Sequence, residues 1–252
     1  MYLDINLIDL LKNNEYYSYF GSHGYIDAIS YTKGYELIAH CYELLQNNNT
    51  LYKEDVISNL RKAINLRIKD LNTNLNFEKI QNWDLAKKNK LEMLEQLGIV
   101  KPFLIKKLLN IRNGIEYDGA NPPSSIECLE LIDIVWYFYK STDSYCIIDP
   151  DEFQIEFDDK ENHCIALDFD FKSHKTLNFN GRMPQNYITD KPKINTIKIN
   201  NFFYKDFSKN DYKKYFKANA EISPHYYSGT LNVEDIPNYI EIVAHILTKW
   251  KF

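Results

Sequence analysis

The sequence predicts an α+β protein, in which an antiparallel helical bundle is followed by a mainly antiparallel sheet and a C-terminal helix. Two observations support this fold class. Apolar residues recur at helical spacing through residues 1–140, whereas apolar and polar residues alternate through most of 145–230. The change of period places a domain boundary near residue 142. We therefore expect a helical domain at 1–142 and a sheet domain at 143–252.

Five amphipathic segments make up the predicted bundle. The expected helices cover about 22–46, 53–71, 83–97 and 102–117, with a fifth that begins at Ser124. Ser124 and Glu127 form the pattern of a capping box, which marks a helix start. Short connections between the helices favour antiparallel packing.

The helical patterns also assign residues to faces. On the second helix, Arg67 is placed on the charged outer face together with its basic neighbours. On the fifth helix, Leu129 and Trp136 are placed on the buried face. Both assignments follow from spacing alone.

Four segments in the second half alternate apolar and polar residues. The expected strands are 153–158, 164–171, 175–180 and 194–200. A further strand at 225–233 and a helix at 234–250 complete the prediction, and Asn180-Gly181 is expected to form a turn. Strict alternation predicts a sheet with one wet face.

The overall composition is that of a globular protein. Of the 252 residues, 44% are hydrophobic and 26% are charged, which argues against a disordered or fibrous chain. The net charge of -5 argues against a globally basic nucleic-acid coat. The N-terminus has no basic signal-peptide region, and no apolar run approaches the ~20 residues of a membrane span. We therefore expect a soluble cytoplasmic protein with no membrane partner.

Charge is segregated within the second half of the chain. Residues 143–170 hold ten acidic residues and one lysine, whereas 172–217 hold eleven basic residues and three acidic ones. These are either solvated faces that partly neutralise each other or a basic surface for RNA or another anion. The segment 210–217, NDYKKYFK, mixes lysine with aromatic residues, as nucleic-acid binders do.

The common catalytic signatures do not occur in this sequence. It has no phosphate-binding loop, dinucleotide glycine motif, zinc-protease motif or nucleophile elbow. Its four cysteines lack zinc-site spacing, so we expect reduced, buried thiols. No cofactor and no metal are expected.

One short motif remains, the segment LLNIRNGIEYDG at 108–119. It lies at the end of the fourth predicted helix and resembles the signature R-N-x-x-x-H of the HEPN superfamily of helical domains. Arg112 and Asn113 match its first two positions, and Tyr117 stands at the position of the histidine. The resemblance covers about 20–140 in architecture, but only the Arg-Asn pair in motif.

The resemblance implies a homodimer that binds or cuts RNA, often within a toxin–antitoxin or antiviral defence system. In active members, arginine and histidine from both protomers form a metal-free endoribonuclease site. Arg112 would stabilise phosphate charge, with Asn113, Tyr117 and Glu116 as the other candidate catalytic residues. Tyrosine replaces histidine poorly as a base, because a phenol ionises only at about pH 10. The resemblance therefore favours RNA binding or a degenerate nuclease, for which the nearby Lys101, Lys106 and Lys107 are candidate RNA-binding residues.

Three other interpretations stay open. Arg112 can instead form an ion pair with Glu116 four residues later, while Asn113 bonds to the following loop. The protein can be a non-enzymatic homodimeric scaffold, whose sheet domain holds a protein partner. An enzyme site can also lie in the sheet domain, using His163, His174 or Asp170.

Overall fold

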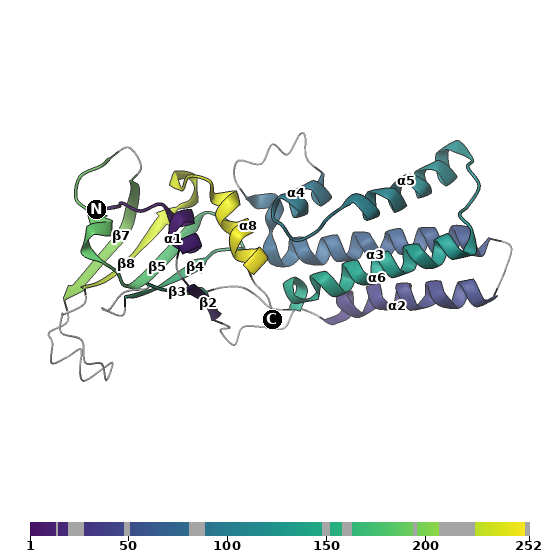
Figure 1. Cartoon of the computed structure of the whole chain (residues 1–252), viewed down its shortest axis with the longest axis horizontal. Coiled ribbons are helices and arrows are strands. Elements are labelled where there is room, and N and C mark those ends of the chain that lie inside the picture. Colours follow the sequence, from purple (N-terminus) through teal and green to yellow (C-terminus); the bar gives the residue numbers. More distant parts are fainter. Residues whose placement is uncertain are drawn as a thin grey trace. The chain divides into compact units, whose positions relative to one another are not determined.

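The computed structural model describes residues 1–13, 15–19, 28–47, 51–80, 89–147, 152–157, 163–193, 196–206 and 225–249. The chain divides into two compact units (Figure 1). The sheet unit comprises 1–23, 79–83 and 150–251, and the helical unit comprises 24–78 and 84–149. The α+β class predicted from the sequence is therefore confirmed.

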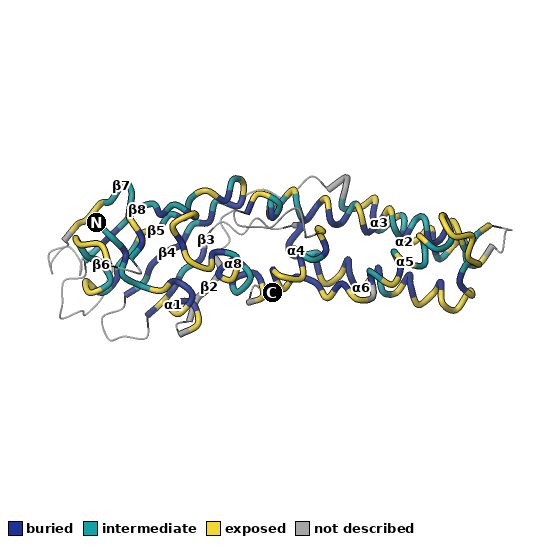
Figure 2. The backbone as a smooth tube through the Cα atoms, turned by 90° about the horizontal axis from the view of Figure 1, so that it is seen from above, coloured by how far each residue is buried: buried dark blue, intermediate teal, exposed yellow. Residues whose placement is uncertain are grey.

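In the part of the chain that the structure describes, the helical unit holds three long helices and two shorter ones. They are α2 (Ala28–Asn47), α3 (Tyr52–Leu75), α4 (Lys90–Gln96), α5 (Phe103–Asp118) and α6 (Ser125–Ile147). The helices α2, α3 and α6 pack against one another, and α5 packs on α3 and α6 (Figure 1). Buried and exposed positions alternate along these helices, as expected of amphipathic segments (Figure 2). Among the described residues, no helix is both long and apolar enough to cross a membrane.

The helix boundaries agree with the sequence prediction where local chemistry sets them. The backbone N–H of Ser124 donates to Glu127 Oε2 (2.8 Å), and the N–H of Glu127 donates to Ser124 Oγ (3.2 Å), so the capping box is confirmed. The residues 22–27 and 83–88, assigned to two predicted helices, lie outside the described residues. At its other end α6 continues to Ile147, beyond the expected start of the strands at 145, because Tyr145 and Cys146 still face the bundle interior.

The sheet unit holds one eight-stranded sheet among the described residues. Its strands are β1 (Tyr2–Leu3), β2 (Glu15–Tyr19), β3 (Glu152–Glu156), β4 (Cys164–Phe169), β5 (Thr176–Arg182), β6 (Ile188–Thr189), β7 (Ile197–Asp206) and β8 (His225–Asn232). The spatial order is β2-β3-β4-β5-β8-β7-β1-β6. Every pairing is antiparallel, as the alternating pattern predicted.

The first residues of the chain belong to this sheet, although the sequence analysis assigned 1–142 to the helical domain. The strand β1 pairs with β6 and β7, and β2 pairs with β3. Between them lies α1 (Leu7–Asn13). These partners are more than a hundred residues away along the chain, and local periodicity carries no information about such pairings.

The expected turn at Asn180-Gly181 is wrong, because both residues lie within β5. Gly181 pairs with Ile165 of β4 and Tyr227 of β8 at φ 141°. A Cβ atom at Gly181 would lie 2.3 Å from the carbonyl oxygen of Cys164. Glycine here permits a close approach of two strands rather than a turn.

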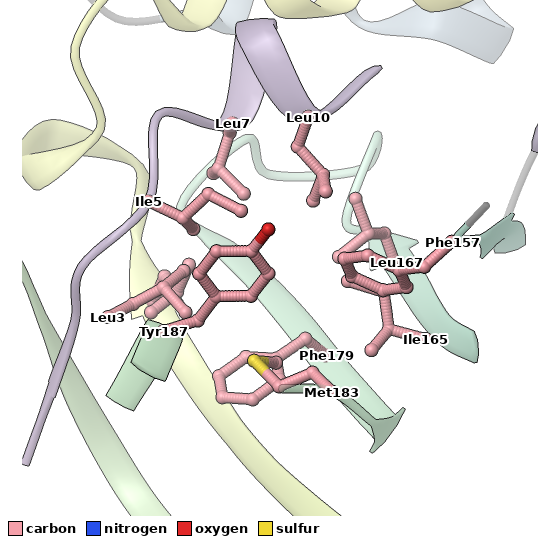
Figure 3. A pocket seen from close by; sticks show the side chains of 11 residues that line it. Leu3, Ile5, Leu7, Leu10, Phe157, Ile165, Leu167, Phe179, Met183 and Tyr187 are labelled. Carbon is pink, nitrogen blue, oxygen red and sulfur yellow. The ribbon is translucent and has the colours of Figure 1, made fainter. Parts of the chain in front are cut away.

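The helices α1 and α8 (Tyr239–Lys249) cover the same face of the sheet. Leu7 and Leu10 of α1 point towards Leu167 and Phe179 of the strands (Figure 3). The ring of Tyr239 in α8 stacks on Phe169 at the end of β4. The opposite face is polar and half-exposed, so the predicted wet face is confirmed.

Candidate functional site

The segment 108–119 forms the last three turns of α5, where the sequence placed it. The helix follows Pro102 and ends at Gly119, whose φ of 63° is left-handed. The N–H of Ala120 donates to the carbonyl oxygen of Gly114 (3.0 Å), which closes the end of the helix. A single helix therefore carries all the candidate motif residues.

Three of those residues lie together at this helix end. Arg112 Nη1 donates to Asn113 Oδ1 (3.1 Å), and its guanidinium carbon lies 5.4 Å from the centre of the Tyr117 ring. Asn113 thus binds the side chain of Arg112. The alternative expectation, a hydrogen bond from Asn113 to the following loop, is not met among the described residues. The side chain of Glu116 lies outside the described residues, so its ion pair with Arg112 stays a prediction.

The nearby lysines divide into two groups. Lys101 and Lys107 are exposed. Lys106 is half-buried, and its Nζ lies 3.3 Å from Glu92 Oε1 in α4. A hydrogen bond from the Asn89 backbone, helped by Lys106, lowers the pKa of Glu92. Lys106 therefore ties α4 to α5 and is the least available of the three for RNA.

The outward side of α5 forms a continuous polar and aromatic row. Phe103, Lys107, Asn110, Asn113 and Tyr117 follow 4-3-3-4 spacing and are all exposed, and we call this row the α5 ridge. The two aromatic ends are 78% and 76% exposed. At 1.5 Å per residue the ridge extends about 21 Å. On the opposite side, Ile105 and Leu108 are buried and fix the orientation of the ridge.

Arg67 is fully buried, so its predicted place on the outer face of the helix is wrong. Its Nη2 donates to Asp143 Oδ1 (2.8 Å), and its guanidinium carbon lies 3.9 Å from the centre of the Tyr139 ring. The hydroxyl of Tyr35 donates to the other oxygen of Asp143 (2.6 Å). Leu60, Ile64 and Leu71 place residue 67 on the same helix face, and this spacing was the signal available in the sequence.

The thiol and the phenols beside the ion pair of Arg67 and Asp143 are held neutral. Burial raises the pKa of the Cys146 thiol to about 11, and it raises the pKa values of the Tyr139 and Tyr35 hydroxyls well above their ordinary value. Neutral thiols and phenols are poor nucleophiles at physiological pH. The exposed fraction of Arg67 is zero, so its guanidinium is closed to solvent, and its ion pair with Asp143 joins α3 to α6.

The burial predicted for the fifth helix is wrong at two positions. Leu129 is 44% exposed and Trp136 is 37% exposed, although both were expected to be buried. Ile132 and Tyr139, which the same spacing assigned to this face, are buried as expected, and the buried face of α6 also includes Leu131, Val135 and Phe138. Because α6 is apolar on nearly all sides, its periodicity does not fix which face is buried.

The three candidates in the sheet unit do not all meet. Asp170 and His174 share one turn, in which the backbone N–H of His174 donates to the carbonyl oxygen of Asp170 (2.7 Å), whereas His163 lies apart. His163 and Asp170 lie just before and just after β4, so about 23 Å of strand separates them. His174 is fully buried against the Tyr239 hydroxyl (3.2 Å). Burial opposes ionisation of Asp170, but hydrogen bonds from Ser173 and Lys172 lower its pKa. The carboxylate of Asp170 therefore stabilises the turn that follows it.

The cavities described in the sheet unit offer no built site. One, of about 10 Å³, lies between α1 and the sheet and is lined by apolar side chains and Tyr187 (Figure 3). An apolar space of that size stays dry. An open hollow of about 350 Å³ beside β1 includes Asp4, whose carboxylate already binds Lys193.

Besides the segment 210–217, the sequence holds a second basic cluster, at residues 87, 88 and 90. The segment 210–217 and the lysines at 87 and 88 lie outside the described residues. Lys90 lies 3.1 Å from Glu78 Oε2.

The chain matches no model of a known protein family, no curated protein and no solved structure. The likeness of residues 20–140 to HEPN domains is therefore an inference from the helices and from Arg112 and Asn113 alone.

We expect Asp143→Asn to lower the free energy of unfolding by about 3 kcal/mol, because it leaves the buried charge of Arg67 without a counter-charge. The matched control is Asp133→Asn on the same helix. Asp133 also accepts a hydrogen bond from a tyrosine of α2, Tyr42 (2.6 Å), but it is exposed. The control should cost less than about 1 kcal/mol. Urea denaturation followed by circular dichroism compares the two, and equal losses would contradict the structural role of Arg67.

Proposed function

We propose that the helical unit is a HEPN-like domain that binds single-stranded RNA along the α5 ridge. The observation that carries this proposal is the exposure of Phe103 and Tyr117, one at each end of a row that also holds a lysine and two asparagines. Both rings are open to water, and a row of polar side chains connects them, which suits a ligand that offers both aromatic and polar groups.

The chemistry of the ridge suits unpaired nucleotides. Bases stack on exposed aromatic rings whatever their sequence, which supports Phe103 and Tyr117 as stacking platforms. Lys101 and Lys107 can neutralise phosphates. Asn110 and Asn113 carry amide groups that pair with the edges of unstacked bases.

Binding is better supported than cleavage. Cleavage at a ribose 2′-hydroxyl requires a base for its proton and a cation for the phosphate charge. Arg112 is the candidate cation, beside Tyr117. The family signature has an imidazole where Tyr117 has a phenol, whose neutral oxygen accepts a proton poorly, so the motif lacks a good general base. We therefore propose an RNA-binding protein or degenerate metal-free endoribonuclease, with a toxin–antitoxin or antiviral role following from the resemblance.

The second candidate function is a homodimeric scaffold, which the outer face of α6 favours. Ile126 is 73% exposed and Tyr137 is 67% exposed on this face, beside the half-exposed Leu129 and Trp136. Asp133 and Lys140 lie seven residues apart on the same face. In an antiparallel pair of α6 helices, Asp133 of each copy would meet Lys140 of the other, with Trp136 against Tyr137.

Replacing either aromatic end of the ridge tests RNA binding. We expect Phe103→Ala and Tyr117→Ala each to weaken binding of a fluorescently labelled single-stranded RNA at least fivefold, because each loses a stacking platform. Fluorescence anisotropy measures the affinity. Tyr137→Ala, which removes an equally exposed ring from α6, is the matched control and should bind as the unchanged protein does. Equal behaviour of all three variants would contradict the ridge as the RNA site.

Replacing Tyr117 by the histidine of the family signature tests whether the motif at 112–117 is a nuclease site. We expect Tyr117→His to cleave RNA in the presence of a metal chelator faster than the unchanged protein does, because imidazole ionises near neutral pH. Adding Arg112→Ala to Tyr117→His should abolish the gain. Gel analysis of the RNA products follows the reaction. If Tyr117→His still binds RNA but never cuts it, the HEPN active-site assignment is wrong.

A further inference from the structure

The open face of the sheet, turned away from α1 and α8, is chemically uneven. On the adjacent strands β5, β8 and β7 it carries three cations, Arg182, Lys198 and Lys205, and two aromatic residues, Phe203 and Tyr226. The other described positions on this face of the three strands are asparagine, serine or threonine, and none is a carboxylate. We call this area the basic open face.

The residues of the basic open face form ordered rows across the strands. Arg182 of β5 is paired with Tyr226 of β8, and Tyr226 is paired with Lys205 of β7. Neighbouring strands lie about 4.8 Å apart, so the row spans about 10 Å with its aromatic residue between two cations. Phe203 lies in the next row, opposite Ser228.

A β-bulge places Phe203 and Lys205 on this face. The register of β7 against β8 shifts between Asn200 and Phe203, and the extra residue Asn201 has a left-handed φ of 50°. Without the bulge, simple alternation from Asn200 would turn Phe203 and Lys205 towards the helices. The ring of Phe202 instead lies on the side of the buried Tyr227, 6.2 Å away.

The result is an apolar ring held in water on a polar face. Phe203 is 52% exposed, although the covered face of the same sheet is apolar. Bulges re-aim side chains in this way beside binding sites. The bulge thus places Phe202 beside Tyr227 on one face and Phe203 in water on the other, with Asn201 in the left-handed conformation that asparagine tolerates better than most residues.

The polar groups between the rows are held in place by one another. Thr230 Oγ1 donates to Asn178 Oδ1 (2.9 Å), and Asn178 Nδ2 donates to Asp168 Oδ2 on β4 (3.2 Å). Asp168 begins the acidic part of the sheet, which also includes the exposed Glu156 of β3. Carboxylates therefore border the basic open face on one side and disfavour an anionic chain there.

We propose that the basic open face is a second surface for single-stranded RNA, separate from the α5 ridge. The phosphates are neutralised by Arg182, Lys198 and Lys205, and the bases stack on Phe203 and Tyr226. The amide and hydroxyl groups of this face, which include those of Asn178 and Thr230, form hydrogen bonds to base edges and to the ribose 2′-hydroxyl. The charge of this face and its exposed ring select an unpaired polyanion over an acidic peptide, which offers no bases to stack.

The test measures binding of the full chain to labelled oligouridine by fluorescence anisotropy over a range of salt concentrations. Phe203→Ala should weaken binding at least fivefold, through loss of stacking. Arg182→Gln and Lys205→Gln should each lower the slope of log affinity against log salt by roughly 0.7. Lys172→Gln, an exposed lysine on a turn of the same unit, is the matched control and should leave the slope unchanged.

The outcomes separate this surface from the α5 ridge. If Phe203→Ala, Arg182→Gln and Lys205→Gln bind oligouridine as the unchanged protein does, the basic open face is not an RNA site, whatever Phe103→Ala and Tyr117→Ala show. If only the sheet variants lose affinity, the ridge fails and this surface stands. Oligodeoxythymidine binding as tightly as oligouridine would overturn the assignment to RNA. Because Phe203 is half-exposed, an unchanged circular dichroism spectrum should accompany its replacement.

Discussion

The helical unit depends on one buried ion pair. The guanidinium of Arg67 has no exposed surface, so its charge must be balanced inside the bundle, and Asp143 balances it at 2.8 Å. Tyr139 stacks on the guanidinium, and Tyr35 binds the same carboxylate. These groups come from α2, α3 and α6, so one interaction joins three helices. The α5 ridge takes its orientation from this frame, because α5 packs on α3 and α6.

The two faces of the sheet differ in polarity because only one of them is buried. The helices α1 and α8 take up the apolar side chains of one face, which leaves the other face to polar residues. A single bulge at Asn201 then adds Phe203 and Lys205 to that polar face. The two surfaces proposed for RNA thus arise by different means, from helix periodicity on α5 and from strand register on β7. They share exposed aromatic rings, cations and amides.

Local patterns predicted the local structure well. The helix α5, the capping box at Ser124 and the strand β4 lie close to where spacing placed them, because each signal is contained in a few neighbouring residues. The spacing of Leu60, Ile64 and Leu71 placed residue 67 on the buried face, but its charge favoured the outer face, because local spacing does not show Asp143 beside it. Exposure of Trp136 depends on which helix packs where, and this is a tertiary property. The basic open face could not be predicted, since the direction of Phe203 depends on the register between β7 and β8. The motif residues Arg112, Asn113 and Tyr117 were found because they lie on one helix.

We propose that single-stranded RNA lies against exposed aromatic residues in both units. Photochemical crosslinking of the full chain to RNA that contains 4-thiouridine, with the crosslinked peptides identified by mass spectrometry, tests it most directly. We predict crosslinks in α5, at Phe103 or Tyr117, and in β7 or β8, at Phe203 or Tyr226. Crosslinks confined to other segments, or RNA that is not bound at all, would contradict the account.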